Sequence, residues 1–269
     1  MDKYPFALGA TSLTKPVKSV FDNFEINRQL GFDVVEVTLE YPRTMPITKD
    51  LKETMLRYKT EYDFEFTIHL PLSLQMTSVN PHMREGSLKT LEEIFEEMKE
   101  VAPKAYVLHV SPFFLTGGTP LGRPFEVQLH QDRLNAARET LSQLSNIIDP
   151  QMVAVENLFH DIRFLEEFIH EFDYGVCMDV GHILLNKSDL YLHYHKYKDR
   201  IKVIHLHDVV NGSDHQQLGE EGSQLDLEAF FYLLKKHNYN ETIILEQFKI
   251  EHLNQSLSAI DNAWHSITD

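Results

Sequence analysis

Short, nearly continuous apolar runs alternate along this chain with longer segments in which apolar residues recur every three or four positions. The short runs predict strands buried on both faces, and the longer segments predict amphipathic helices. The predicted strands are Pro5–Ala10, Asp33–Thr38, Phe64–Leu70, Ala105–Val110, Met152–Asn157, Gly175–Asp179, Ile201–Leu206 and Thr242–Gln247. The predicted helices are Pro16–Leu30, Thr48–Tyr62, Arg84–Val101, Gln128–Ile148, Asp161–Phe172, Ser188–Lys198, Asp226–His237 and Glu251–His265.

Regular alternation of strands and helices is typical of α/β proteins with a parallel sheet. Eight strand–helix units in 269 residues predict a (β/α)8 TIM barrel, formed by a single domain over residues 1–269. An open doubly wound sheet is the alternative, but the segment Gly9–Ser12 after the first strand lacks the G-x-G-x-x-G dinucleotide motif. The stretch richest in Pro, Gly and Ser, Ser111–Pro124, is predicted to be a loop after the fourth strand.

Residue types that bind metals stand at the ends of six consecutive predicted strands. They are His69, His109, Glu156, Asp179, His205 and Glu246, and His182 follows Asp179 by three residues. The carboxyl ends of barrel strands meet at one mouth, so these side chains are expected to converge. Burying so many carboxylates and imidazoles is costly unless they are paired or bound to a cation. The pattern therefore predicts a site for divalent transition-metal ions.

The charge and cysteine content limit the partners and the compartment. The formal net charge is −16, which argues against duplex DNA, because proteins that neutralise many phosphates usually present a basic surface. The single Cys177 cannot form an internal disulfide, and the N-terminal residues do not resemble a signal peptide. No apolar run approaches the ~18–20 residues that span a bilayer. We therefore predict a cytoplasmic protein, with no membrane or protein partner indicated.

Three motifs resemble those of the xylose isomerase-like TIM barrels, and within them the endonuclease IV branch. GVCMDVGH at Gly175–His182 is similar to that branch's G-V-C-[IV]-D-x-x-H. HLHD at His205–Asp208 is similar to H-L-N-D, and HQQLGEEG at His215–Gly222 to H-x-x-[IL]-G-E-G. The resemblance implies a barrel that binds two or three divalent ions at its mouth, zinc by first expectation and manganese as the alternative.

The resemblance also implies which residues hold each ion. The first ion would be held by His69, His109 and Glu156. The second would share Glu156 and add Asp179, His205 and Glu246. The third would be held by His182 and His215, together with an Asp two residues before the latter. Here that position is Ser213, and Asp214 is displaced by one residue, which leaves the third ion open. His207 is a candidate for a place behind these ligands.

Two metal ions bridged by a carboxylate can hydrolyse phosphoesters. We therefore predict a metal-dependent hydrolase of a phosphodiester or phosphomonoester in a bulky small molecule, with Glu156 and Glu246 as catalytic residues. Arg43 and Arg123, in the loops after the second and fourth strands, are predicted to contact the substrate phosphate. The cobamide-remodelling branch of the superfamily, which acts on the phosphodiester of a nucleotide loop, is compatible with the apolar loops at the mouth.

The alternative function is a sugar or sugar-phosphate isomerase or epimerase. Enzymes of this class in the superfamily use essentially the second site, where Glu156 and Glu246 would move a proton next to a carbonyl across one metal ion. Both classes share the ligands of the second site. The hydrolase prediction therefore rests on His69 and His109. A binding protein that retains a metal site without catalysis is a third possibility.

Overall fold

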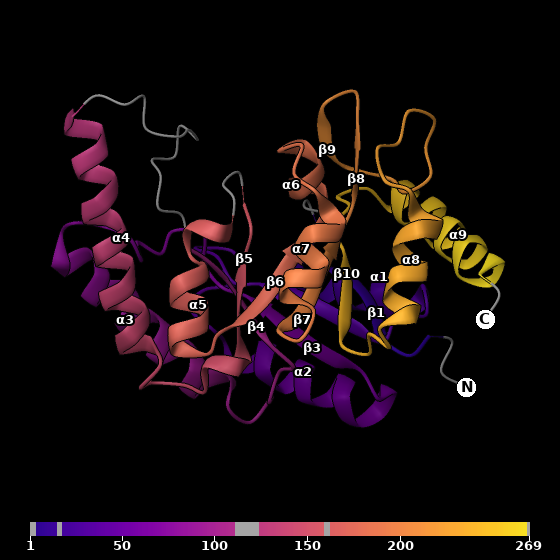
Figure 1. The fold of residues 1–269 in the computed structure, drawn as a ribbon. Helices are drawn as coiled ribbons and strands as arrows, with labels where there is room; N and C mark the ends of the chain where they lie inside the picture. The colour runs from indigo at the N-terminus through magenta and orange to yellow at the C-terminus, as the bar shows by residue number, and fades with distance from the viewer. Residues whose placement is uncertain (1–3, 15–17, 111–123, 159–161, 268–269) are drawn as a thin grey trace.

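The computed structural model describes residues 4–14, 18–110, 124–158 and 162–267. Eight parallel strands close into a barrel in the order β1-β2-β3-β4-β5-β6-β7-β10, surrounded by helices (Figure 1). These strands are Ala7–Thr11 (β1), Val34–Thr38 (β2), Glu65–His69 (β3), Tyr106–His109 (β4), Val153–Glu156 (β5), Gly175–Asp179 (β6), Ile201–Leu206 (β7) and Thr242–Leu245 (β10). The closed order confirms the predicted (β/α)8 barrel and excludes the open sheet.

In the described residues, at least one helix follows each strand of the barrel. These helices are Val20–Gln29 (α1), Lys49–Tyr62 (α2), Pro81–Met98 (α3), Pro124–Leu144 (α4), Glu166–Phe172 (α5), Val180–Leu185 (α6), Leu190–Tyr197 (α7), Leu227–Lys236 (α8) and Ile250–Ser266 (α9). Helix α6 was not predicted, because its six residues are too few for a helical period to be read. The hairpin of β8 (Asp208–Val210) and β9 (Ser213–Gln216) was also not predicted. Helix α6 and this hairpin both project at the mouth of the barrel (Figure 1).

Capping residues explain where two helices begin. Helix α1 begins at Val20 because Ser19 and Asp22 form a reciprocal capping box. Helix α3 begins at Pro81, three residues before the predicted start at Arg84, because the side chain of Asn80 accepts a bond from the backbone N–H of His82. Proline is favourable in the first turn, where its missing N–H has no partner to lose.

The apolar residues of the barrel form two separate clusters, one on each face of the strands. The larger cluster includes residues of the helices and lies between them and the barrel. The smaller cluster contains no helix residue and fills the barrel interior. Side chains two residues apart on a strand share one face. Six interior positions precede a polar residue by two: Val34 and Glu36, Val107 and His109, Ala154 and Glu156, Cys177 and Asp179, Val203 and His205, Ile244 and Glu246. The interior therefore has an apolar floor below a polar layer at the mouth.

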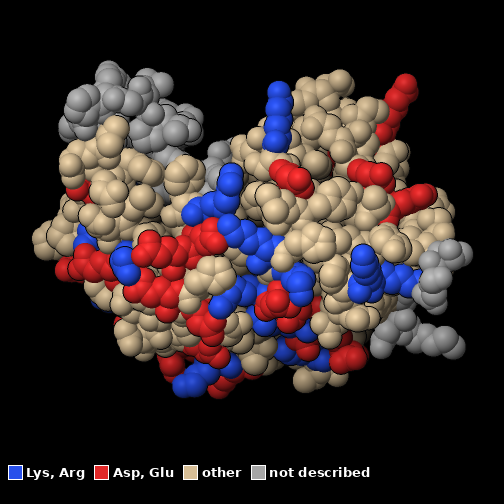
Figure 2. Space-filling view, in the orientation of Figure 1, with Lys and Arg blue, Asp and Glu red and all other residues tan. Residues whose placement is uncertain are grey.

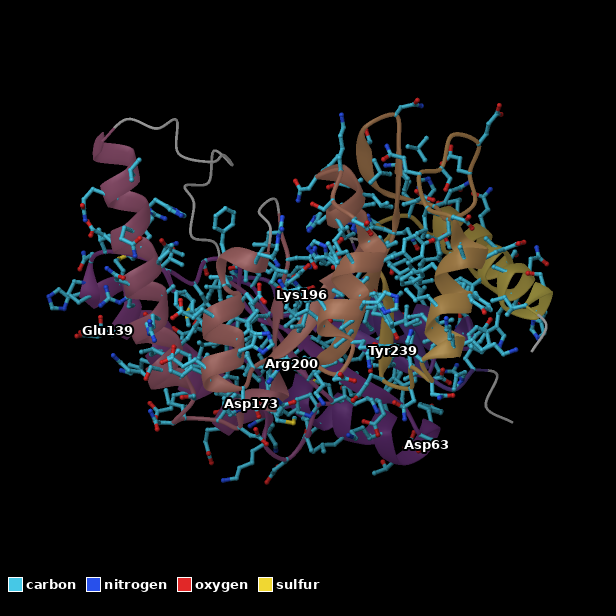
Figure 3. The ribbon with its side chains drawn as sticks, viewed as in Figure 1. Asp63, Glu139, Asp173, Lys196, Arg200 and Tyr239 are labelled. Atoms are coloured by element: carbon cyan, nitrogen blue, oxygen red, sulfur yellow. The ribbon has the colours of Figure 1, made fainter. Side chains whose placement is uncertain are left out.

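The outer surface carries acidic and basic side chains that intermingle on the face shown in Figure 2. Ion pairs tie neighbouring helices and loops: Arg200 Nη1 bonds Asp173 Oδ1 at 2.6 Å (Figure 3), and Lys196 Nζ bonds Glu166 Oε2 at 2.6 Å. Pairs this exposed each contribute about 0–1 kcal/mol to stability. Among the residues that the structure describes, no helix combines the length and the apolar character that crossing a membrane requires.

Candidate metal centre

Four candidate ligands from four strands meet at the mouth of the barrel. They are Glu156 at the end of β5, Asp179 at the end of β6, His205 in β7 and Glu246 just after β10. One ligand atom of each lies within 4.8 Å of the corresponding atom of every other. Each of these side chains is buried. The structure therefore brings together the ligand set shared by both of the predicted functions, and we refer to it below as the central group.

The ring of His205 organises the central group through its Nδ1 atom. Nδ1 lies 3.0 Å from Glu156 Oε1, 3.6 Å from Glu246 Oε1 and 3.9 Å from Asp179 Oδ2. One nitrogen atom of a fully buried ring therefore faces all three carboxylates. A convergent set of one imidazole and three carboxylates is a donor set that divalent transition metals accept.

The two histidines on which the hydrolase prediction rested lie beside the same glutamate. His109 Nε2 is 2.7 Å from Glu156 Oε2, and His69 Nε2 is 3.6 Å from that oxygen. The two rings meet edge to face with centroids 4.7 Å apart. The side chain of His109 is 24 % exposed, so a ligand entering the mouth can reach it. The structure thus brings together His69, His109 and Glu156, as predicted, and both rings approach the same carboxylate oxygen of Glu156.

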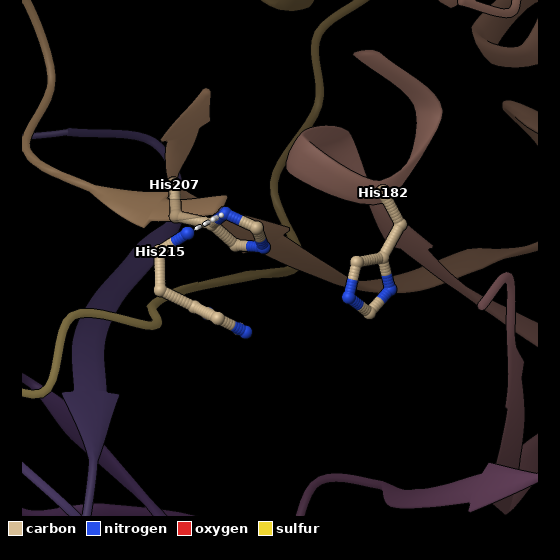
Figure 4. Close-up of side chains that lie close together, drawn as sticks. All are labelled: His182, His207 and His215. Atoms are coloured by element: carbon tan, nitrogen blue, oxygen red, sulfur yellow. Dashed lines mark hydrogen bonds between the residues drawn. The ribbon is translucent and has the colours of Figure 1, made fainter. Parts of the chain in front are cut away.

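A second group of histidines lies at the edge of the mouth (Figure 4). It consists of His182 on α6, His207 after β7 and His215 on β9, with one nitrogen of each within 4.8 Å of the others. The rings of His207 and His215 stack with centroids 4.2 Å apart, and the backbone N–H of His215 donates to His207 Nδ1 at 2.9 Å. His207 was expected behind the ligands, and its Nε2 indeed lies 3.1 Å from Asp179 Oδ1.

Asp214 lies beside this second group even though it is displaced by one residue from the expected position. Its Oδ2 atom is 3.9 Å from His182 Nε2 and 3.9 Å from His215 Nε2. The backbone of His215 adopts a positive φ of 52°, and the tight hairpin brings Asp214 toward the two rings. Ser213, which occupies the expected position, is exposed.

The sequence interpretation missed one buried carboxylate of this region, that of Glu36 on β2. Its Oε1 atom lies 3.0 Å from His205 Nε2, and its Oε2 atom accepts a bond from Thr67 Oγ1 at 3.0 Å. Oxygen atoms of Glu36 and Glu246 and a nitrogen of His69 lie within 4.8 Å of one another. The alternation that places Glu36 two residues after interior Val34 could have identified it, but only strand ends were considered.

Burial raises the pKa of each carboxylate in the central group, and the neighbouring imidazole rings lower it. Burial raises the pKa of Glu156, but His205 and His109 lower it by more, so that its pKa falls well below the usual value. Burial raises the pKa of Glu246, and the adjacent Glu156 carboxylate adds to this effect against the attraction of His205. Burial also raises the pKa of Asp179, but His207 and His182 bring it down to about 2.

The charges of the central group fit a bound cation. Three carboxylates and Glu36 are buried together, and the ion pairs found for them in the described part of the chain are all with histidines rather than with lysine or arginine. Glu156 Oε2 and Glu36 Oε1 lack an aligned hydrogen bond. Buried charges of one sign are costly without compensation. A divalent ion in contact with the carboxylates of the central group would compensate these charges.

Arg43 and Arg123 are the two residues predicted to contact a substrate phosphate. Arg43 lies on the exposed loop after β2, where its Nη2 donates to the backbone oxygen of Lys18 at 3.1 Å. Its contact with a substrate stays a prediction. Arg123 lies outside the described residues.

A family model described as xylose isomerase-like TIM barrel matches residues 24–263. Among solved structures, a D-tagatose 3-epimerase-like protein superposes with a TM-score of 0.81 at 19 % identity over 97 % of this chain and 98 % of that chain. The IolI protein with a bound zinc atom superposes with a TM-score of 0.70 at 14 % identity over 97 % of this chain and 96 % of that chain. D-psicose 3-epimerase from Clostridium cellulolyticum H10, with D-tagatose, superposes with a TM-score of 0.67 at 13 % identity over 97 % of this chain and 96 % of that chain. No curated protein matches the sequence.

These comparisons overturn the prediction of a phosphoester hydrolase, including one acting on a cobamide nucleotide loop. Several of the similar structures are epimerases of sugars, which corresponds to the alternative function. The error has a physical reason. His69 and His109 were taken as ligands of an additional ion, whereas a histidine that contacts Glu156 is equally suited to pairing with that carboxylate or contacting a substrate.

Proposed function

This chain belongs to the xylose isomerase-like TIM barrel family, and on that premise we propose that it is a divalent-metal-dependent epimerase or isomerase of a sugar or sugar derivative. The family match over residues 24–263 confirms the resemblance inferred from the motifs. The observation that carries the proposal is the central group itself, in which Glu156 and Glu246 come from different strands and converge with Asp179 and His205. Several similar solved structures are epimerases of ketohexoses, which supports this class of substrate.

The reaction requires a proton to leave and return to a carbon atom next to a carbonyl. In our proposal, Glu156, Asp179, His205 and Glu246 hold one ion, which when bound polarises the carbonyl and an adjacent hydroxyl of the sugar. One glutamate removes the proton from one face of the carbon, and the other returns a proton to the opposite face or to the neighbouring carbon. Glu156 and Glu246 are suited to this exchange in our proposal, because they stand at the ends of different strands and both belong to the central group.

The histidines beside Glu156 have a role in this proposal that needs no additional ion. His109 is partly exposed at the mouth, and its Nε2 already faces Glu156 at 2.7 Å. His69 stands behind it in edge-to-face contact. These imidazoles would fix the orientation of the Glu156 carboxylate and offer a hydrogen bond to a substrate hydroxyl.

We further propose that the second group of histidines holds another ion, of the zinc type. His182 Nε2 and His215 Nε2 each lie 3.9 Å from Asp214 Oδ2, and imidazole and carboxylate ligands suit zinc. A metal count on the purified protein tests both proposals. We expect two ions in the wild type, one in His182→Ala, and persistence of catalysis in that variant. A count of one in the wild type would overturn the second site.

The decisive experiment for the proposed function follows the proton. The metal-loaded protein is incubated with a panel of ketoses and aldoses in D2O, and we expect deuterium to appear at the carbon next to the carbonyl. The variants Glu156→Gln and Glu246→Gln should lose at least about 10²-fold in exchange rate, since general acid–base catalysis typically contributes 10²–10⁴-fold. Glu92→Gln, on the exposed face of α3, is the matched control and should exchange normally. Absence of exchange with every sugar of the panel would overturn the proposal.

A further inference from the structure

We infer that Glu36 is a positioning residue that holds the proton of His205 on Nε2, so that Nδ1 of the same ring is free to bind a metal ion. The inference rests on the metal site of the proposed function. A neutral imidazole carries one proton, and only the nitrogen without it can bind a metal. The group that faces the other nitrogen therefore decides which atom is the ligand.

The two nitrogen atoms of His205 have different surroundings. Nδ1 faces Glu156 and Glu246 of the central group at 3.0 and 3.6 Å. Nε2 points to the opposite side, toward β2, where Glu36 Oε1 lies at 3.0 Å. Neither Glu36 Oε1 nor His205 Nε2 has an aligned hydrogen bond to any group in the described part of the chain. The two atoms are thus each other's available partner across the barrel.

The barrel fixes the position of the Glu36 carboxylate. Glu36 aligns with Thr67 in the pairing of β2 with β3, and Thr67 Oγ1 donates to Glu36 Oε2 at 3.0 Å. This bond engages one carboxylate oxygen and leaves the other directed at His205. Glu36 is fully buried. A buried carboxylate is costly to retain, and pairing with an imidazole N–H compensates part of that cost.

Two other groups compete for this role. The thiol of Cys177 lies near His205, but a thiol is a weak hydrogen-bond acceptor, and burial raises its pKa well above the usual value. Glu36 could instead bind an ion directly, since an oxygen of it lies within 4.8 Å of ligand atoms of His69 and Glu246. The bond from Thr67 and the 3.0 Å approach to His205 favour the positioning role.

The test measures zinc binding by calorimetry and identifies the metal-bound nitrogen by ring-¹⁵N NMR. In the wild type we expect His205 to bind zinc through Nδ1. In Glu36→Gln we expect zinc affinity to fall about 10–100-fold, the usual effect of removing such a partner, and catalysis to return at saturating zinc. Glu36→Asp should lose less, and it serves as the second variant if Glu36→Gln does not fold. Glu65→Gln, on neighbouring β3 and paired with Lys59, is the matched control and should bind zinc normally.

The outcomes separate this inference from the proposed function. Coordination through Nε2 in the wild type, an unchanged zinc affinity in Glu36→Gln, or the loss of one oxygen ligand in that variant would each overturn the inference. A defect that saturating zinc does not reverse would also overturn it, because that defect is structural. A wild type that binds zinc through Nδ1 but exchanges no sugar protons would overturn the proposed function alone. A wild type that binds no metal would overturn both.

Discussion

The side chain of Asn157 bonds both backbone groups of Asp179. Its Nδ2 donates to the carbonyl oxygen of Asp179 at 2.9 Å, and its Oδ1 accepts from the backbone N–H of Asp179 at 2.9 Å. Because Asn157 follows Glu156 directly, one amide side chain sets the ends of β5 and β6 relative to each other. The distance between two candidate ligands, Glu156 and Asp179, therefore depends on a residue that need not touch the ion.

Replacement of Asn157 by Ala is expected to destabilise the metal-free protein by about 1–3 kcal/mol, the usual cost of one unsatisfied buried group. The change leaves the buried backbone N–H of Asp179 without its partner, whereas the Asp179 carbonyl lies at the N-cap of α6 and keeps the first bond of that helix. Urea denaturation measures the loss. Asn254→Ala, on the exposed surface of α9, is the control and should change stability by less than about 0.5 kcal/mol. Equal stabilities of the two variants would show that the Asn157 bonds contribute nothing.

Removal of metal by a chelator is expected to lower the melting temperature. An ion present at 100 times its dissociation constant stabilises the folded state by about 2.7 kcal/mol, which corresponds to roughly 5–10 °C for a chain of this size. Scanning calorimetry with and without chelator measures the shift. Asp179→Asn should lose most of the shift, whereas His265→Ala, an exposed histidine of α9, should retain it. If the chelator left the melting temperature of the wild type unchanged, metal binding by the central group would be contradicted.

The sequence predicted the barrel because its strands are apolar on both faces and its helices have long amphipathic periods. The same strands placed Glu156, Asp179 and His205 at the mouth, because parallel strands end on one side. The place of His207 in the sequence did not indicate that its ring lies with those of His182 and His215. Its stacking on His215 depends on a hairpin whose tight turn carries a positive φ at Asn211 and Gly212. The function could not be chosen because both enzyme classes use the same central group.

Cys177 is expected to resist thiol reagents in the folded protein under mildly alkaline conditions in which exposed cysteines react. The residue is fully buried in the floor of the barrel, and burial raises its pKa well above the usual value because the thiolate is poorly solvated there. The reactive thiolate is therefore scarce in the native state at pH values where an exposed cysteine reacts readily. Reaction with a chromogenic disulfide should reach one thiol per chain only in denaturant. Rapid reaction of the native protein at pH 8 would contradict this burial.

Replacement of Gly181 by Ala is expected to displace His207. A β-carbon at Gly181 would lie 1.9 Å from Cε1 and 2.1 Å from Nδ1 of the His207 ring, far inside contact distance. The ring would have to move away from Asp179, whose carboxylate it contacts at 3.1 Å. Overpacking of this kind usually costs about 1–3 kcal/mol. We also expect the loss of the ion proposed for the second group of histidines.

Gly86→Ala is the matched control for this substitution. Gly86 lies within α3 on the exposed side, and no atom outside its own helix lies within 4 Å of a β-carbon placed there. Alanine in a helix is favoured over glycine by about 0.5–1 kcal/mol, so this variant should be slightly more stable than the wild type. The two substitutions should therefore move stability in opposite directions in the same denaturation assay. If Gly181→Ala kept wild-type stability and the wild-type metal count, the ring of His207 would have room to move, and its contact with Asp179 would not be needed to hold the site.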